Sequence, residues 1–237
     1  MPFEHKQNLD CTHCAKRFTN VFCNTQYDSL ENLNLEKICS TYKKGESIFK
    51  EGTRPHGIFC VNFGKIKLSK MGDDGKEQII RLVKAGDPLG YRAILSGDKY
   101  SSSAVAIEDS GVCFIPKEFF MNILEKDSNL SLEMMKLLSD DLRKAEVQIT
   151  HLAQKPVRER VAEAVLFIKE TYGFEADGKT IDASFSREDI ANIVGTATET
   201  AIRLLSEMNK DKILQLSGKK IIILDMQKLV KTANLCD

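Results

Sequence analysis

Residues 186–209 read SREDIANIVGTATETAIRLLSEMN and contain the signals for two short helices. Ser186 and Asp189 have the spacing of a capping box, in which the serine oxygen accepts from an amide of the first turn and the carboxylate reaches back, so a helix begins here. Gly195 ends this helix, because glycine is common directly after a helix, and a second helix follows from Thr198. Two short helices joined by a tight turn that contains glycine predict a helix-turn-helix.

A β-hairpin is expected directly after this pair of helices. Residues 213–216 and 220–224 are rich in isoleucine and leucine, and Ser217-Gly218-Lys219 between them is a turn signal. The hairpin would make the unit a winged helix-turn-helix. Many helical proteins contain two helices and a turn that bind nothing, so the polar side chains of the second helix must distinguish a binding unit from a purely structural one.

The polar face of the second helix carries side chains that can read base pairs. An arginine can donate two hydrogen bonds to guanine and a glutamate can accept one from cytosine, so Glu199 and Arg203 can together read a G·C pair and its neighbour. A second role for Glu199 is a capping box with Thr196, three residues earlier, and the glutamate cannot fill both roles at once. The predicted DNA-binding residues are Ser186, Arg187, Thr196, Thr198, Glu199, Ile202 and Arg203.

Composition limits the class of protein. The 34 basic and 34 acidic side chains of the 237 residues cancel, so binding to nucleic acid or membrane must come from local charge rather than net charge. No apolar stretch approaches the roughly 20 residues that span a bilayer, and the start MPFEHKQNLD lacks the features of a secretory signal. We therefore expect a cytoplasmic protein without a membrane partner. In that reducing compartment the seven cysteines would have a role other than disulfides.

Residues 42–116 are expected to form an antiparallel roll or barrel. Short runs rich in isoleucine, valine and phenylalanine alternate here with glycine-containing turns, at the spacing that is typical of such folds. Residues 65–68 alternate between the two faces of a strand, and Gly-Asp-Asp-Gly at 72–75 is a hairpin connection into residues 78–83.

A long helix is predicted C-terminal to Pro116. Its apolar residues are spaced alternately by three and four positions, which is the a/d pattern of a coiled coil. This seam consists of Met135, Leu138, Leu142, Ala145, Ile149 and Leu152. A helix that lies on its own barrel is one interpretation. We favour a parallel homodimer, because a narrow stripe suits a partner helix better than a broad core face. Pro156 then breaks or bends the helix and marks a domain boundary.

Together these features resemble the CRP/FNR family of transcription regulators. The resemblance rests on residues 186–205 and on three glycine-punctuated segments, which read KGESIFKEG at 44–52, GKIKL at 64–68 and AGDPLG at 85–90. It implies an α+β chain with a cyclic-nucleotide-binding-like β-roll (a jelly roll), a long dimerisation helix and a C-terminal winged helix-turn-helix. The expected parts are a cysteine-containing N-terminal arm at 1–24, the β-roll sensor domain at 25–127, the dimerisation helix at 128–154 and the DNA-binding domain at 155–237.

The resemblance also implies the partners. Members of this family are homodimers that bind a palindromic site in double-stranded DNA and work with RNA polymerase. Glu199 and Arg203 occupy the positions that read bases in the family. Thr198 stands where the cyclic-AMP regulator has an arginine, which favours an FNR-type half-site.

The positions that match the effector pocket of the family are Gly90, Tyr91, Arg92, Ser102 and Ser103. In the cyclic-nucleotide members an arginine holds the ligand phosphate and a glutamate holds a ribose hydroxyl. Here Tyr91 stands in place of the glutamate and Ser102 near the place of the arginine, with Arg92 as a displaced substitute. Because a buried phosphate without its cation is costly, the resemblance argues against cyclic AMP as the effector.

Cysteines suggest a different signal. Cys11, Cys14 and Cys23 in the arm, with the remote Cys113, are similar to the four thiolates that hold the [4Fe-4S] cluster of FNR. Oxygen dismantles such a cluster. The eight residues between Cys14 and Cys23 are more than is usual in FNR proteins, so the spacing alone does not identify the site.

Other uses of these residues stay open at this point. A zinc ion can bind with His5 or His13, and without any metal Cys23 and Cys113 would be small core residues. Some family members ligate haem through an N-terminal proline, and Pro2 is present. Cys39, Cys60 and Cys236 are expected to be structural or incidental.

The sequence thus predicts a dimeric, sequence-specific transcription regulator without catalytic activity, which responds to oxygen or redox state rather than to cyclic AMP. Alternatives within the family are a small-molecule effector in the β-roll, or none. A cyclic-nucleotide-type regulatory subunit that docks on a protein partner is an alternative of another class, which the wing and the Glu199/Arg203 pair argue against. An enzyme of the cupin kind would need a histidine-rich metal triad in the roll, and His56 is the only histidine between residues 14 and 150.

Overall fold

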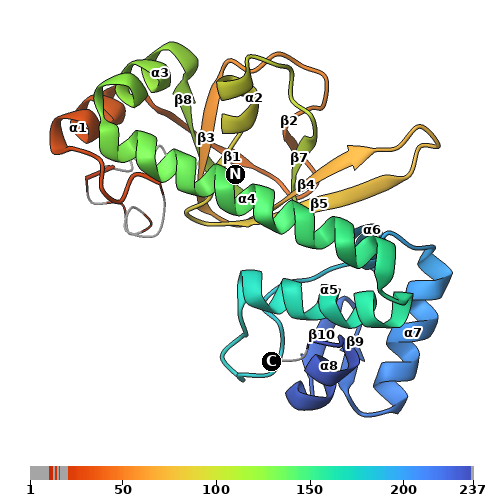
Figure 1. The fold of residues 1–237 in the computed structure, drawn as a ribbon. Helices are drawn as coiled ribbons and strands as arrows, with labels where there is room; N and C mark the ends of the chain where they lie inside the picture. The colour runs from red at the N-terminus through yellow and green to blue at the C-terminus, as the bar shows by residue number, and fades with distance from the viewer. Residues whose placement is uncertain (1–10, 13, 15, 17–20, 236–237) are drawn as a thin grey trace. The chain divides into compact units, whose positions relative to one another are not determined.

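The computed structural model describes residues 11, 12, 14, 16 and 21–235, and Figure 1 shows the course of the chain. Packing contacts divide the chain into two compact units. One comprises the residues up to 70 with 83–143, and the other comprises 71–82 with 144–237. No helix in the described ranges is long and apolar enough to cross a membrane.

Two four-stranded sheets form the β-roll, with strand orders β1-β8-β3-β6 and β2-β7-β4-β5. The pairs whose register is defined, such as β1 with β8 and β3 with β8, are antiparallel. The strands are β1 (Ile38–Tyr42), β2 (Ser47–Phe49), β3 (Gly57–Phe63), β4 (Lys65–Met71), β5 (Glu77–Lys84), β6 (Pro88–Leu89), β7 (Ser103–Ala106) and β8 (Ser110–Pro116). The predicted antiparallel roll is confirmed.

Strands β3 and β8 lie side by side at the centre of the first sheet. Ile58 and Ile115 are paired across them and are almost fully buried, which agrees with alternating inward positions on a half-buried strand. Gly57 begins β3 where a Cβ atom would lie 2.1 Å from the carbonyl oxygen of Ile115. Only glycine therefore lets the two backbones approach this closely.

Three shorter helices accompany the roll: α1 (Tyr27–Glu36), α2 (Tyr91–Ser96) and α3 (Lys117–Lys126). Leu30 of α1 and Phe120 of α3 pack into one apolar cluster with Ile58, Ile115 and Leu130, and all five are almost fully buried. Burial of each such side chain contributes about 1.5–3 kcal/mol relative to exposure. This cluster fixes α1 and α3 on the face of the sheet formed by β3 and β8.

The long helix α4 (Ser128–Gln154) begins at a buried carboxylate. Asp127 is only 1% exposed, and its Oδ1 accepts from the backbone N–H groups of Asn129 and Leu130 at 3.0 and 3.2 Å. Its Oδ2 accepts from the backbone N–H of Gln26 at 2.8 Å. Because the first amides of a helix have no partner within the helix, one side chain caps α4 and also holds the segment that leads into α1.

The second unit contains the winged helix-turn-helix. Its elements after α4 are α5 (Val157–Tyr172), α6 (Arg187–Val194), α7 (Thr198–Lys210), β9 (Leu214–Ser217), β10 (Lys220–Ile223) and α8 (Met226–Thr232). Pro156 stands just before α5, where a proline fits because the first helical residues need no internal donor. The core is formed by Val161, Val165, Ile168, Ile190, Leu205 and Met208.

Candidate nucleic-acid interface

The start of α6 is fixed by its own side chains. The Ser186 hydroxyl oxygen accepts from the Asp189 N–H at 2.9 Å, and the Asp189 carboxylate accepts from the Ser186 N–H at 3.0 Å. This is the predicted capping box, and both halves are present. Gly195 ends α6 with φ of 70°, a left-handed conformation that glycine adopts without strain. The turn into α7 is therefore set by local sequence.

Helix α7 separates its side chains into two faces. Ala201, Leu204, Leu205 and Met208 are buried, whereas Glu199, Ile202 and Arg203 are exposed. The residue that precedes α7 is Ala197, and no side chain caps the helix. The alternative capping role of Glu199 with Thr196 is therefore not used, and the Glu199 carboxylate stays on the exposed face.

Arg203 lies at one end of a row of charges. Its Nη1 donates to Glu207 Oε1 at 2.7 Å, and Glu207 Oε2 accepts from Arg158 Nη1 at 2.8 Å. Arg158 Nη2 in turn donates to Asp211 at 2.8 Å. The contact with Glu207 holds the Arg203 guanidinium along the helix surface. Because the Arg203 side chain is 64% exposed, breaking this ion pair costs little free energy. Sequence reasoning missed Glu207, although its spacing of four residues from Arg203 is the signal for such a pair.

Arg187 has a more internal position than expected for a DNA contact. It is half-buried, and its Nη2 donates to the carbonyl oxygen of Gly218 at 3.0 Å. Burial lowers the pKa of its guanidinium. Gly218 lies in the turn between β9 and β10, so Arg187 joins the start of α6 to the wing.

The wing is also held to α7. The backbone N–H of Leu216 on β9 donates to Asn209 Oδ1 at 3.0 Å. Gly218 has φ of 57°, and Lys219 beside it is exposed. The expected three-residue turn is one residue shorter, because Ser217 pairs with Lys220. The wing thus presents one cation at its tip from a fixed hairpin.

Apolar side chains of α4 remain exposed. Met135, Leu142 and Ile149 of the predicted seam are 57%, 62% and 66% exposed, and Leu152 is 39% exposed. Ala145 is exposed as well, and Leu138 is half-buried. Side chains this exposed do not belong to the core of the described chain. This exposure favours a seam that meets a partner helix, and which of the two interpretations holds stays a prediction.

The residues that match the effector pocket have separate environments. Tyr91 is buried in the apolar cluster, and its hydroxyl bonds to the carboxylate of Asp141 on α4. Arg92 is exposed, while Ser102 is buried. The Ser103 hydroxyl oxygen accepts from the backbone N–H of Glu51 at 3.0 Å. Gly90 has a left-handed φ of 78° and precedes α2.

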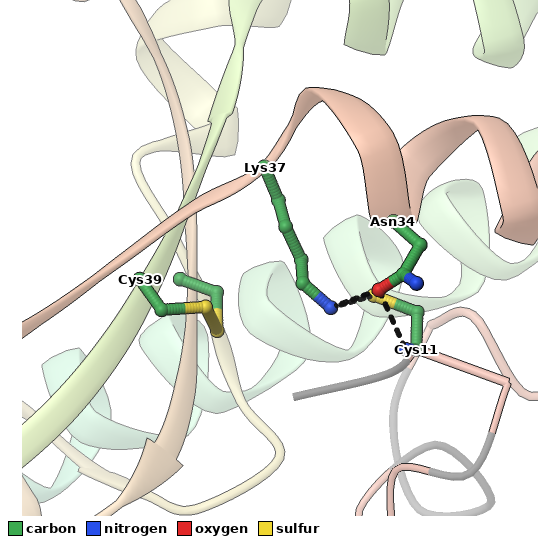
Figure 2. Close-up of a disulfide and its surroundings, with 5 residues drawn as sticks. Cys11, Asn34, Lys37 and Cys39 are labelled. Carbon is green, nitrogen blue, oxygen red and sulfur yellow. Dashed lines mark hydrogen bonds between the residues drawn. A yellow bond between two sulfur atoms is a disulfide. The ribbon is translucent and has the colours of Figure 1, made fainter. Parts of the chain in front are cut away.

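Four cysteines from distant parts of the sequence line one small cavity of about 50 Å³. They are Cys11, Cys14, Cys60 and Cys113. Lys37, which follows α1, donates from Nζ to Cys11 Sγ at 3.1 Å and also to the side-chain oxygen of Asn34 (Figure 2). Of the described cysteines in the arm, Cys23 does not line this cavity.

The expectation that the cysteines take no part in disulfides is wrong for one pair. Cys39 on β1 and Cys113 on β8 are directly opposite each other, with Cα atoms 4.0 Å apart, and are joined by a disulfide (Figure 2). The physical reason is the register of two strands that lie 74 residues apart in sequence, which composition and compartment do not reveal.

This disulfide also decides how the predicted metal ligands fit. Cys113 Sγ is bonded to carbon and sulfur and offers no thiolate, and among the described residues no three histidine, cysteine or acidic side chains are grouped as metal ligands would be. In this disulfide-bonded state the arrangement does not fit a [4Fe-4S] cluster held by Cys11, Cys14, Cys23 and Cys113. His5 and His13, named for zinc, Pro2, named for haem, and Cys236, named as structural or incidental, lie outside the described residues.

Comparison with known proteins agrees with this architecture. A family model described as a cyclic nucleotide-binding domain matches residues 39–127, and a Crp-like helix-turn-helix domain matches residues 159–232. The chain is 32% identical over 232 residues to the fumarate and nitrate reduction regulatory protein of Vibrio cholerae, which covers 94% of this chain and 91% of that protein. The protein of the same name from Escherichia coli is 32% identical over 211 residues, with 88% and 82% covered.

Solved structures give the same result. FixK2 from Bradyrhizobium japonicum superimposes with a TM-score of 0.76 at 25% identity and covers 85% of this chain and 99% of its own. The relatives are transcription regulators and not enzymes, which agrees with the prediction of a non-catalytic chain. From the winged helix-turn-helix, the β-roll and the identity to these regulators it follows that the chain belongs to the CRP/FNR family of transcription regulators.

Proposed function

We propose that two copies of this DNA-binding regulator pair through α4 and present their α7 helices to successive major grooves of a palindromic site. The observation that carries this proposal is the sorting of α7, whose apolar side chains are buried while Glu199, Ile202 and Arg203 are exposed. A recognition helix contacts base edges with the residues near its N-terminal end. In a two-fold dimer the half-site centres lie about 10 base pairs apart, or a multiple of that distance.

Dimerisation through α4 is supported by its exposed apolar seam. Leu142 and Ile149 are each more than 60% exposed, and they are separated by seven residues, which brings them to the same side of a coiled coil. An apolar stripe that stays exposed along a helix is a surface for another protein. A second copy satisfies it, because the a/d pattern is self-complementary.

The remaining predicted DNA contacts divide into two roles. Thr196 lies just before α7 and Thr198 begins it, and both would contact the DNA backbone beside Glu199 and Arg203. Ser186 and Arg187 would act mainly by position, because one caps α6 and the other holds the turn of the wing. Lys219 at the wing tip is an exposed cation and would contact phosphate.

The signal that we propose is related to redox state rather than to cyclic AMP. Tyr91 is buried against α4 and Arg92 is exposed, so neither is placed to hold a nucleotide phosphate or ribose inside the roll. The named relatives regulate fumarate and nitrate reduction, and we infer a signal of the same kind for this chain, which would act in the cytoplasm with RNA polymerase.

Selection of DNA sites from random duplexes tests the proposal. The selection is carried out once with a reductant and once without it. In at least one of these two states the purified full chain is expected to enrich two inverted half-sites with the spacing given above. Sedimentation of the protein with the enriched duplex should show two chains per site. Recovery of no preferred sequence in either state, or of a single unrepeated half-site bound by one chain, would contradict it.

A further inference from the structure

Cys113 has a cysteine directly opposite it on both neighbouring strands. Strand β8 lies between β1 and β3 in the first sheet. The register pairs Cys113 with Cys39 on β1 and also with Cys60 on β3. Three cysteines therefore form one row across three adjacent strands, which we call the cysteine row.

The side chains of the cysteine row point to the same face of the sheet. Residues that are directly opposite in an antiparallel pair share a face, and so do residues two positions apart on one strand. Ile58 and Ile115 are such neighbours of Cys60 and Cys113, and they are buried in the apolar cluster with α1 and α3. Cys60 and Cys113 accordingly both line the small cavity on this face.

We propose that Cys113 is the shared sulfur of a thiol–disulfide exchange site, in which it bonds either to Cys39 or to Cys60 but never to both. The structure holds the first state, with Cys39 bonded to Cys113 and Cys60 free. The second state needs no change of strand pairing, because Cys60 is already the cross-strand partner of Cys113. Opposite residues on antiparallel strands lie about 4.5–5.5 Å apart, within the reach of a disulfide.

The exchange is balanced without an external oxidant. The Cys60 thiol loses its proton to solvent, and the resulting thiolate attacks Cys113 Sγ and forms the new S–S bond. The bond from Cys113 to Cys39 breaks, and its electron pair leaves on Cys39 Sγ, which takes a proton from water. Complete reduction of the row needs a thiol such as glutathione, and reoxidation of two of its thiols needs a disulfide such as oxidised glutathione, which accepts the two electrons.

The surroundings of the row make its two outer members different. Cys39 is exposed on the edge strand β1, whereas Cys60 is half-buried beside the cavity. Burial raises the pKa of the Cys60 thiol, the Cys11 and Cys14 sulfurs raise it further, and the Lys37 ammonium opposes them. An external thiol therefore reaches the row at Cys39, and the interior member reacts more slowly.

Exchange would change which strands are joined covalently. In the observed state the disulfide fixes the edge strand β1, which begins directly after α1 and Lys37, to β8. In the other state β8 is fixed to β3, and β1 keeps only its hydrogen bonds while an exposed Cys39 thiol becomes available for modification. The inference does not depend on DNA binding, because both states are defined by their sulfur bonds.

Peptide mapping without reduction tests the proposal on the full chain. Complete trypsin cleavage places the three members on different peptides, residues 38–43 for Cys39, 51–65 for Cys60 and 100–117 for Cys113. After equilibration with oxidised and reduced glutathione, mass spectrometry of the digested native protein should find residues 100–117 linked to 38–43 in some molecules and to 51–65 in others. The variant Cys39→Ser should give only the link to 51–65, and Cys60→Ser only the link to 38–43.

Matched variants keep the result interpretable. Cys23 lies outside the cysteine row, so Cys23→Ser should leave both disulfide links unchanged. Circular dichroism of each variant checks that it is folded. A folded Cys39→Ser protein that keeps Cys60 and Cys113 as free thiols, or that links Cys113 to the peptide of Cys11 and Cys14 at residues 7–16, overturns the proposal.

Discussion

Replacement of Arg203 by alanine should weaken binding to the selected DNA site and leave binding to scrambled DNA almost unchanged. A good arginine–guanine contact contributes about 1–3 kcal/mol of discrimination. In free protein the guanidinium is already paired with Glu207 at 2.7 Å on an exposed helix surface. Breaking such a pair costs about 0.3–0.5 kcal/mol, so the net loss is roughly 0.5–2.5 kcal/mol, or about 2- to 60-fold in Kd.

The matched variant is Glu207→Gln, which removes the competing charge but keeps an amide for hydrogen bonding. Arg203 is then free to leave the helix surface, and specific binding should become tighter by about twofold. Arg158 keeps its contact with Asp211, so the free energy of unfolding should change by less than about 1 kcal/mol.

Fluorescence anisotropy with labelled duplexes, one selected and one scrambled, measures both variants at a fixed salt concentration. Thermal unfolding followed by circular dichroism serves as the control for folding. Equal losses of Arg203→Ala on both duplexes would refute base reading and would leave Arg203 as a phosphate contact. No effect on either duplex would remove α7 from the interface.

Three further predictions concern assembly and stability. Leu142→Glu places like charges opposite each other in the seam and should give monomers in sedimentation, whereas Thr150→Glu, exposed on α4 outside the seam, should stay dimeric. Ser186→Ala removes half of the capping box and should lower the free energy of unfolding by about 1 kcal/mol in urea titration, with no change for a control at Ser217. The Thr180 hydroxyl and the amides of Lys179 and Thr180 lower the pKa of Asp177 from 3.8 to about 2. This folded-state pKa lies below the unfolded value, so the ionised Asp177 stabilises the folded state above about pH 4, and this stabilisation is lost as the pH falls toward 2. Asp177→Asn should therefore remove this part of the pH dependence of the free energy of unfolding.

The helix-turn-helix could be predicted because its signals are local. The capping box and Gly195 lie within one short segment, and both have the predicted geometry. The buried face of α7 follows from its spacing of three and four residues, and it is confirmed at Leu204, Leu205 and Met208. Such features depend on neighbours in sequence, which a single chain displays directly.

Features that depend on register between distant segments were not predictable. The expectation for Cys39 is a structural or incidental role, and nothing in the sequence indicates that strand pairing places it opposite Cys113. The position of Arg187 depends on where the wing folds back, and its partner Gly218 lies 31 residues away. Helix α1 is not predicted either, because its apolar face packs against partners that come together only when the roll has formed. Neither the hydrophobic pattern nor the composition of the sequence indicates these contacts between distant segments.

The carboxylate of Asp127 has one more consequence, which concerns local unfolding. It accepts from the first amides of α4 and from Gln26, a residue 101 positions earlier. If the segment before α1 detaches, the helix amides keep their acceptor and α4 stays wound. If the carboxylate is removed, hydrogen exchange should accelerate at Gln26, Asn129 and Leu130 together, since one side chain protects all three from solvent.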